Sequence, residues 1–224
     1  MTLNARAWLA LAMVGVVTCA LLFGTAGTTQ YWQAWVYVSI FLGASVLTTL
    51  DLMKRDPALL ARRMRGGPMF EKERTQRIIM VFTSLGFVAL LVVPALDHRF
   101  GWSAVPVWAV VLGNVLVAIG FYFIVLVYRE NTFTAATIEV TAGQRVIETG
   151  PYAIVRHPMY ASGLLYMLGM PLALGSYWGF LALAAMTPFL LWRLLDEERI
   201  LTRDLRGYAA YRQRVPHRLV PLVW

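Results

Sequence analysis

Hydrophobic residues along this chain fall into six long runs that are separated by polar segments. A helix needs roughly 20 apolar residues to cross the hydrocarbon core of a bilayer, and the second, third and fourth runs meet that length easily. The pattern predicts an all-α integral membrane protein with about six transmembrane helices, the last two of them a tight helical hairpin turned at residues 175–179. The runs cover Trp8–Phe23, Tyr31–Leu50, Ile78–Leu96, Ala104–Val127, Met159–Leu174 and Trp178–Leu195.

The first run allows a second interpretation, because Arg6 precedes an apolar stretch in the manner of a secretory signal peptide. The run is long for the apolar part of a signal, and no small-x-small cleavage site follows it cleanly. We therefore expect a retained first helix, which can extend from Ala5 to Gly24.

The distribution of charge predicts the orientation. Only 14% of the residues are charged, whereas soluble domains average about 25%. If the six runs cross the membrane in turn, Arg99 alone of the 20 Lys and Arg residues falls on the side opposite the termini. Cytoplasmic loops retain positive charge, so both termini are expected in the cytoplasm. The net charge of +8 then reflects topology and anionic headgroups, and no nucleic-acid partner is expected.

Two of the cytoplasmic segments break the apolar pattern between helices. Residues 51–77 form a basic loop, with a short interfacial helix that is expected to end at Gly66-Gly67-Pro68. Residues 128–158 alternate in a strand-like way over Thr137–Val140 and show a turn signal at Ala142-Gly143. A loop of this length without helix signals is uncommon unless it is functional or disordered, and its Val, Ile and aromatic content argues against disorder.

The C-terminal tail is the third polar segment. It is expected to continue the sixth run as an amphipathic helix that Gly207 breaks, with Pro216 and Pro221 keeping the end extended.

A dense polar cluster stands directly before the fifth run, in the stretch GPYAIVRHPMY. Proline is favoured at the first position of a helix, so a helix is expected to begin at Pro158 with His157 near its cap. His157 and Tyr160 could then both face a polar ligand at the helix N-terminus, where free N–H donors lie. The alternative is that these side chains only anchor the helix at the membrane surface.

Arg193, Glu197 and Glu198 form a second candidate cluster at the end of the sixth run. Ionisable groups at that depth are usually paired and often functional, and Arg193 and Glu197 are four residues apart and share one helix face. A buried Glu197 would balance Arg193 or a cationic ligand, and the alternative is an ordinary surface pair. The sequence shows no HExxH, GxSxG, P-loop or Rossmann pattern, and with a single cysteine and no His close to His157 we expect no metal site.

Taken together, the motifs GPYAIVRHPMY at 150–160, EERIL at 197–201 and GYAAYRQRVPHRLVP at 207–221 resemble the isoprenylcysteine carboxyl methyltransferase family, within the wider phospholipid methyltransferase group. The similarity covers residues 128–224 and is closest to bacterial-type members. It implies a methyltransferase catalytic region at 128–224, four N-terminal helices at 1–127, and a location in the bacterial inner membrane.

The resemblance implies S-adenosylmethionine as the methyl donor and S-adenosylhomocysteine as the product. The implied acceptor is a lipid-like or small membrane-partitioning molecule, most simply the carboxylate of an isoprenylcysteine-type substrate, that enters from the bilayer while the donor enters from the cytoplasm. Arg193 and Glu198 are implied to face the acceptor, and Arg193 and Glu197 to serve catalysis. The residues implied to hold the donor are Gln144, Arg145, Val146, Ile147, Tyr152, His157, Pro158, Met159, Tyr160 and Glu197.

Two departures from the family pattern affect these expectations. The chain has fewer spans than the eukaryotic enzymes, and LRGY follows EERIL where a Phe-Gly pair is common, so the alignment beyond Leu205 is looser. A membrane reductase of the sterol reductase type that uses NADPH, and a non-catalytic membrane scaffold, remain as alternatives. The sequence leaves the oligomeric state open.

Overall fold

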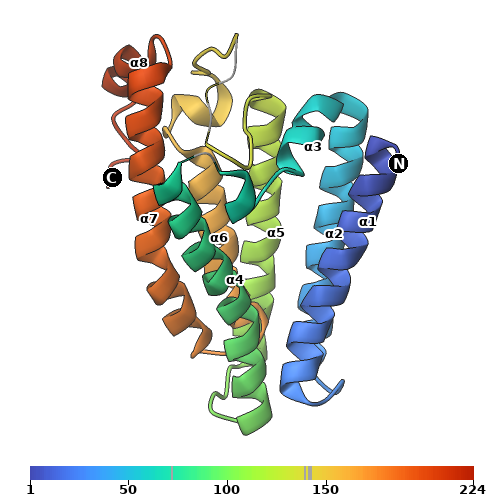
Figure 1. The fold of residues 1–224 in the computed structure, drawn as a ribbon. Helices are drawn as coiled ribbons and strands as arrows, with labels where there is room; N and C mark the ends of the chain where they lie inside the picture. The colour runs from blue at the N-terminus through green and yellow to red at the C-terminus, as the bar shows by residue number, and fades with distance from the viewer. Residues whose placement is uncertain (72, 139, 141–142) are drawn as a thin grey trace.

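The computed structural model describes residues 1–71, 73–138, 140 and 143–224, which form a bundle of long helices (Figure 1). The prediction of an all-α membrane protein is confirmed, since the described residues form helices and no strands. In chain order the elements are α1 (Leu3–Cys19), the π-helix η1 (Ala20–Gly24), α2 (Trp32–Arg55), α3 (Pro57–Arg63), η2 (Pro68–Phe70), α4 (Arg74–Phe100), α5 (Val107–Glu130), η3 (Gly150–Ala153), α6 (Pro158–Ala173), α7 (Gly179–Asp204) and α8 (Tyr208–Arg214).

Each of the six apolar runs corresponds to a helix. Among the described residues, five helical segments are long and apolar enough to cross a membrane: Leu3–Gly24, α2, α4, α5 and α7. The remaining run forms α6, whose 16 residues extend for about 24 Å at the usual rise of an α-helix. That length is shorter than the hydrocarbon core, because α6 begins inside the polar end of the bundle rather than at its surface.

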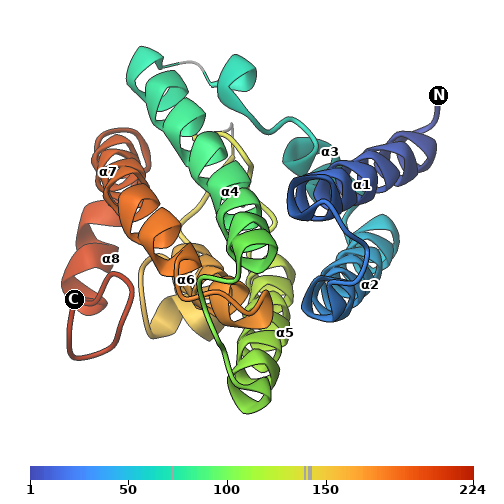
Figure 2. The same ribbon diagram turned by 90° about the horizontal axis from the view of Figure 1, so that it is seen from below.

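The helical hairpin is joined by a tight turn, as predicted, but its two helices pack on different partners. Helix α6 packs mainly against α5, whereas α7 packs mainly against α4 (Figure 2). Gly175 in the turn has a φ of 69°, a conformation that glycine adopts without steric cost. The hydroxyl of Ser176 donates to the buried carboxylate of Asp97 in α4 and so fixes the turn to the neighbouring helix.

The polar segments are more helical than the sequence indicated. The expected interfacial helix is α3, which ends at Arg63, just before the predicted glycine pair. Residues of 137–140 that the structure describes form no strand, and Glu139, Thr141 and Ala142, on which the strand and turn predictions partly fall, lie outside the described residues.

The prediction of an extended C-terminal end is wrong. Gly207 breaks the helix, with a φ of 89°, but helix α8 follows at once, and the last residues fold back on themselves. The backbone N–H groups of Arg218 and Leu219 donate to the carbonyl of Trp224, at 2.8 and 3.0 Å. The Arg218 guanidinium lies 5.0 Å from the centre of the Trp224 ring, and this cation–π contact supports the turn.

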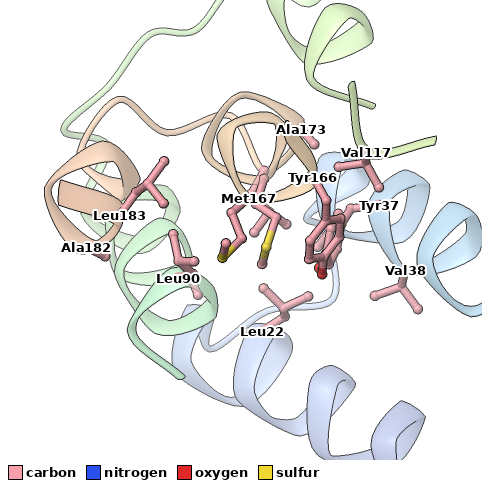
Figure 3. Packing of buried hydrophobic residues seen from close by; sticks show 14 of the residues in the cluster. Leu22, Tyr37, Val38, Leu90, Val117, Tyr166, Met167, Ala173, Ala182 and Leu183 are labelled. Carbon is pink, nitrogen blue, oxygen red and sulfur yellow. The ribbon is translucent and has the colours of Figure 1, made fainter. Parts of the chain in front are cut away.

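A hydrophobic core joins the N-terminal helices to α6 at mid-depth (Figure 3). Leu22, Leu90 and Met167 are buried in it, and the hydroxyls of Tyr37 and Tyr166 are 2.8 Å apart in a buried hydrogen bond. Burial of the two hydroxyls costs less because one of them donates a hydrogen bond to the other. The core therefore holds α2 against α6 and supports the polar end of α6 from below.

Helices α5 and α6 approach each other closely because glycines line their contact. A Cβ atom at Gly113 would lie 2.7 Å from the carbonyl oxygen of Gly169, and one at Gly120 would lie 2.8 Å from the Cα atom of Tyr166. No side chain fits there without moving the backbone of α6.

We predict that Gly113→Ala destabilises the protein by about 1–3 kcal/mol, the usual cost of overpacking a close contact. Thermal unfolding in detergent should show a lower midpoint. Gly43→Ala is the matched control, because a Cβ atom there meets nothing within 4 Å and alanine favours a helix. Equal midpoints for the two variants would contradict the assigned packing.

Candidate active site

The polar cluster GPYAIVRHPMY forms the N-terminus of α6 and the short helix η3 before it. Pro158 is the first residue of α6 and His157 its N-cap, as the sequence predicted. The segment just before α6 is held by the C-terminal tail: the backbone N–H of Arg156 donates to the backbone carbonyl of His217 at 2.9 Å, and that of His157 donates to the backbone carbonyl of Arg218 at 3.0 Å. The motif is therefore clamped between α6 and the end of the chain.

Glu198 of α7 is the centre of a buried ionic cluster behind this motif. Its carboxylate accepts from Arg156 at 2.6 Å and from Arg218 at 2.9 Å, and its Oε1 atom lies 3.7 Å from Nε2 of His157. The Glu198 side chain is only 5% exposed. Arg156 also donates to the carbonyls of Val215 and Pro216, at 2.8 and 2.7 Å. One carboxylate thus joins α7, the His157 motif and the tail.

A cavity of about 410 Å³ lies between these elements. Its walls come from α4, α5, α6, α7 and α8, and from residues 131–138 and 144–147. It forms where α6 and α7 diverge toward their different packing partners. Every residue that the sequence analysis assigned to the donor or to catalysis lines it: Gln144, Arg145, Val146, Ile147, Tyr152, His157, Pro158, Met159, Tyr160, Arg193 and Glu197.

Glu198 does not belong to this lining. The family resemblance implied that Glu198 faces the acceptor. The structure instead places Glu198 behind the His157 motif, where Arg156 and Arg218 pair with it. Its neighbour Glu197 is half-buried in the wall and accepts a hydrogen bond from the Tyr160 hydroxyl at 2.6 Å. Of the two adjacent acids, Glu197 faces the cavity and Glu198 supports the fold around it.

Arg193 is paired, but with a residue that the motifs did not indicate. Its Nη2 atom lies 2.7 Å from Glu71 and 3.0 Å from the carbonyl of Ala136, and its Nη1 atom lies 3.0 Å from Gln76. The sequence suggested Glu197 as the buried acid that balances Arg193. The buried acid is instead Glu71, which is 1% exposed. Arg193 and Glu197 do share the cavity-facing side of α7, as their spacing predicted.

Tyr152 is fixed by its surroundings on the 128–158 segment. Its hydroxyl accepts from the Asn131 side chain at 2.9 Å, and its carbonyl accepts from the Tyr211 hydroxyl at 2.8 Å. Burial raises the pKa of Tyr152, so the phenol stays neutral. Its aromatic ring is therefore held in one position at the cavity wall.

Tyr208, the first residue of α8, was not identified from the sequence. Its side chain is 4% exposed and lines the cavity, and its hydroxyl has no hydrogen-bond partner among the described residues. Burial raises its pKa, so the hydroxyl is protonated. A buried donor without a partner is costly, and its position at a cavity wall indicates a place for a polar ligand atom. The glycine-tyrosine pair after α7 was the only sequence signal for it.

The fold and the site define a multi-span membrane protein with a cavity of mixed polar and apolar lining between its C-terminal helices. Residues 108–207 match the family model described as phospholipid methyltransferase. This segment runs from α5 to the end of the α7–α8 connection and contains the His157 motif, Arg193, Glu197 and Glu198. The resemblance found in the sequence is confirmed over this segment, which is similar to the phospholipid methyltransferase family.

One curated protein is also similar to part of the chain. The Delta(14)-sterol reductase TM7SF2 of Mus musculus is 30% identical over 91 residues, which are 39% of this chain and 22% of that protein. The chain thus spans less than a quarter of the length of this relative.

Among the described residues, no group of three or more His, Cys, Asp or Glu side chains is arranged to hold a metal ion.

We predict that Glu198→Ala lowers the thermal midpoint markedly, because removing one partner from a buried ion pair costs about 3–5 kcal/mol. Glu148→Ala is the control: Glu148 pairs with Arg214 at the surface, where the side chains are 40% and 55% exposed, and such pairs contribute about 0–1 kcal/mol. Thermal unfolding of both variants in the same detergent tests the difference. A midpoint for Glu198→Ala as high as that of the control would show that the cluster does not hold the site together.

Proposed function

We propose that this protein is an integral membrane methyltransferase that takes its methyl group from S-adenosylmethionine and transfers it to a lipid-like or small membrane-partitioning acceptor. The observation that carries the proposal is the single cavity in which the His157 motif and the Arg193–Glu197 face of α7 meet, inside the segment that matches the methyltransferase family. The residues concerned are up to about 50 positions apart in the sequence, and no packing requirement alone explains so many polar groups around one space.

The chemistry of the cavity wall suits this donor. Its volume of about 410 Å³ falls within the range of small-molecule sites, about 300–1,000 Å³. Glu197 offers a carboxylate to the amino group of the donor, Tyr152 an aromatic ring to its base, and Tyr208 the unpartnered hydroxyl. His157, Pro158, Met159 and Tyr160, with Gln144–Ile147 opposite, would hold the remainder.

When bound, S-adenosylmethionine supplies an electrophilic methyl group on a sulfonium and leaves as neutral S-adenosylhomocysteine. A carboxylate acceptor is already ionised at neutral pH, so the protein need only align the two reactants, and alignment can supply much of the rate. Arg193 would bind the carboxylate. A thiol or amine acceptor would instead require a base, and Glu197 or His157 at the cavity wall could take that proton.

The lower part of the cavity suits an apolar acceptor chain. Phe87 of α4, Ile124 of α5, and Leu164 and Met167 of α6 contribute apolar surface there, at the level where the helices are expected to lie in the membrane. An isoprenylcysteine-type molecule has the required combination of an apolar chain and a terminal carboxylate. It is therefore our preferred acceptor.

The proposed location is a bacterial inner membrane, with the cavity and both termini on the cytoplasmic side. The termini lie in the half of the molecule that carries α3 and α8 (Figure 1), which are rich in arginine. Positive charge favours the cytoplasmic side. A soluble donor would then reach the cavity from the cytoplasm.

The identity with a sterol reductase supports a second candidate, an NADPH-dependent membrane reductase. That identity covers 39% of the chain, whereas the methyltransferase family match covers residues 108–207 and includes the motifs at 150–160 and 197–201. Binding of the two cofactors separates the candidates directly.

We predict that S-adenosylhomocysteine raises the thermal midpoint of the full chain in detergent and that NADPH does not, because a ligand that binds only the folded state stabilises it. The reverse result would favour the reductase.

Glu197→Gln and His157→Ala should abolish transfer of a radiolabelled methyl group to membrane extracts while each variant still unfolds cooperatively. Normal turnover in either would reject the assigned site.

A sharper prediction concerns the Tyr208 hydroxyl. Tyr208→Phe should leave the stability of the ligand-free protein unchanged or raise it, because a buried group without a partner is removed. The Kd for S-adenosylhomocysteine should rise about three- to tenfold, which corresponds to the usual net value of one hydrogen bond. Tyr211→Phe is the control: it removes the hydrogen bond to Tyr152 and should lower stability. Unchanged affinity in Tyr208→Phe would mean that this hydroxyl does not contact the donor.

A further inference from the structure

We propose that Glu71 determines how strongly the cavity binds an acidic acceptor, because it controls the charge that Arg193 presents. This inference rests on the proposed function and concerns the acceptor rather than the donor. Glu71 lies outside the segment that matches the methyltransferase family, in the connection between η2 and α4. The N-terminal half of the chain would thus contribute a specificity-determining residue to the site.

Glu71 pairs with Arg193 from the side away from the cavity. Its Oε1 atom lies 2.7 Å from Nη2 of Arg193, and the two side chains are 1% and 10% exposed. Its Oε2 atom accepts from the backbone N–H of Ile138 at 3.3 Å. Arg193 and Ile138 line the cavity, but Glu71 does not, so Glu71 touches the wall from behind.

A second buried group holds the guanidinium in the same orientation. Gln76 of α4 accepts from Nη1 of Arg193 at 3.0 Å and donates in turn to Asp196 of α7. Gln76 is 1% exposed. The guanidinium is therefore fixed by groups of α4, α7 and the η2–α4 connection before any acceptor is bound.

The consequence for binding follows from the charges. At 2.7 Å and with little solvent, the Glu71 carboxylate cancels most of the positive field of Arg193. An acidic acceptor must then share one guanidinium with Glu71, while a neutral acceptor loses nothing. If the Glu71 charge is removed, Arg193 loses its nearest counter-charge and keeps only the weaker attraction of Glu197 on the same side of α7, and proteins disfavour a buried charge that is only partly compensated. An acceptor carboxylate would relieve it and should bind more tightly.

The test compares two probes that differ only in charge. N-acetyl-S-farnesylcysteine carries a free carboxylate, and its methyl ester is neutral. Their Kd values are measured on the full chain in lipid nanodiscs saturated with S-adenosylhomocysteine, which prevents turnover. Glu71→Gln keeps the shape of the side chain and removes its charge. We expect the ratio of the two Kd values to shift about tenfold in favour of the carboxylate, about 1.4 kcal/mol.

Glu73→Gln is the matched control, because it makes the same charge change two residues away at an exposed position. Its ratio should stay at the wild-type value. An equal loss of affinity for both probes in Glu71→Gln would overturn the proposal, because it would show a purely structural role for Glu71. A selective loss of the carboxylate would overturn it as well.

If Glu71→Gln does not fold, Glu71→Asp replaces it. The shorter side chain keeps its charge but withdraws from Arg193, so the ratio should shift in the same direction by a smaller factor, and no selective shift would reject the proposal. Failure of the wild-type protein to bind S-adenosylhomocysteine at all would instead contradict the proposed function. The two failures are therefore distinguishable.

Discussion

The Glu198 carboxylate, buried in α7 within reach of Arg156 and Arg218, joins parts of the chain that no local interaction connects. A buried carboxylate requires compensating partners, and these partners come from the segment before α6 and from the C-terminal tail. The tail in turn binds the backbone of His157. As a result, the start of α6 is fixed to the C-terminal end of α7, although the two helices pack mainly on different neighbours.

The space between these two fixed points becomes the cavity. Helix α6 follows α5 through a glycine-lined contact, and α7 follows α4, so their polar ends separate around a polar wall. Two buried groups of ion pairs flank the site. The Glu198 cluster lies behind the His157 motif, and the Glu71–Arg193 pair lies on the side of the cavity toward α4. Each group satisfies buried charges within the protein, while Glu197 and the Tyr208 hydroxyl are left to face the cavity.

Much of this arrangement could be predicted from the sequence, because it depends on local patterns. The six apolar runs gave six helices, Pro158 began α6, and the helix that carries Arg193 ended at Asp204, shortly before Gly207. The residues that the motifs assigned to the donor line the cavity. Arg193 and Glu197 share one helix face because they are four residues apart.

The remainder depends on tertiary placement, which local patterns do not encode. Glu71 precedes Arg193 by 122 positions in a loop whose many charges suggested a simple membrane-surface segment, so nothing marked it as the partner. Glu198 lies outside the cavity because the C-terminal tail covers its side of α7. Helix α8 was missed because its seven residues follow a glycine break and precede two prolines, and Tyr208 was missed with it.

The most direct test of the account is an experimental structure of the full chain in lipid with bound S-adenosylhomocysteine. We expect the ligand in the cavity between the His157 motif and α7, with a polar atom in hydrogen-bonding distance of the Tyr208 hydroxyl and its sulfur atom facing the part of the cavity that Arg193 lines. A saturated complex that holds the ligand outside this cavity, or in contact with neither His157 nor Glu197, would contradict the account.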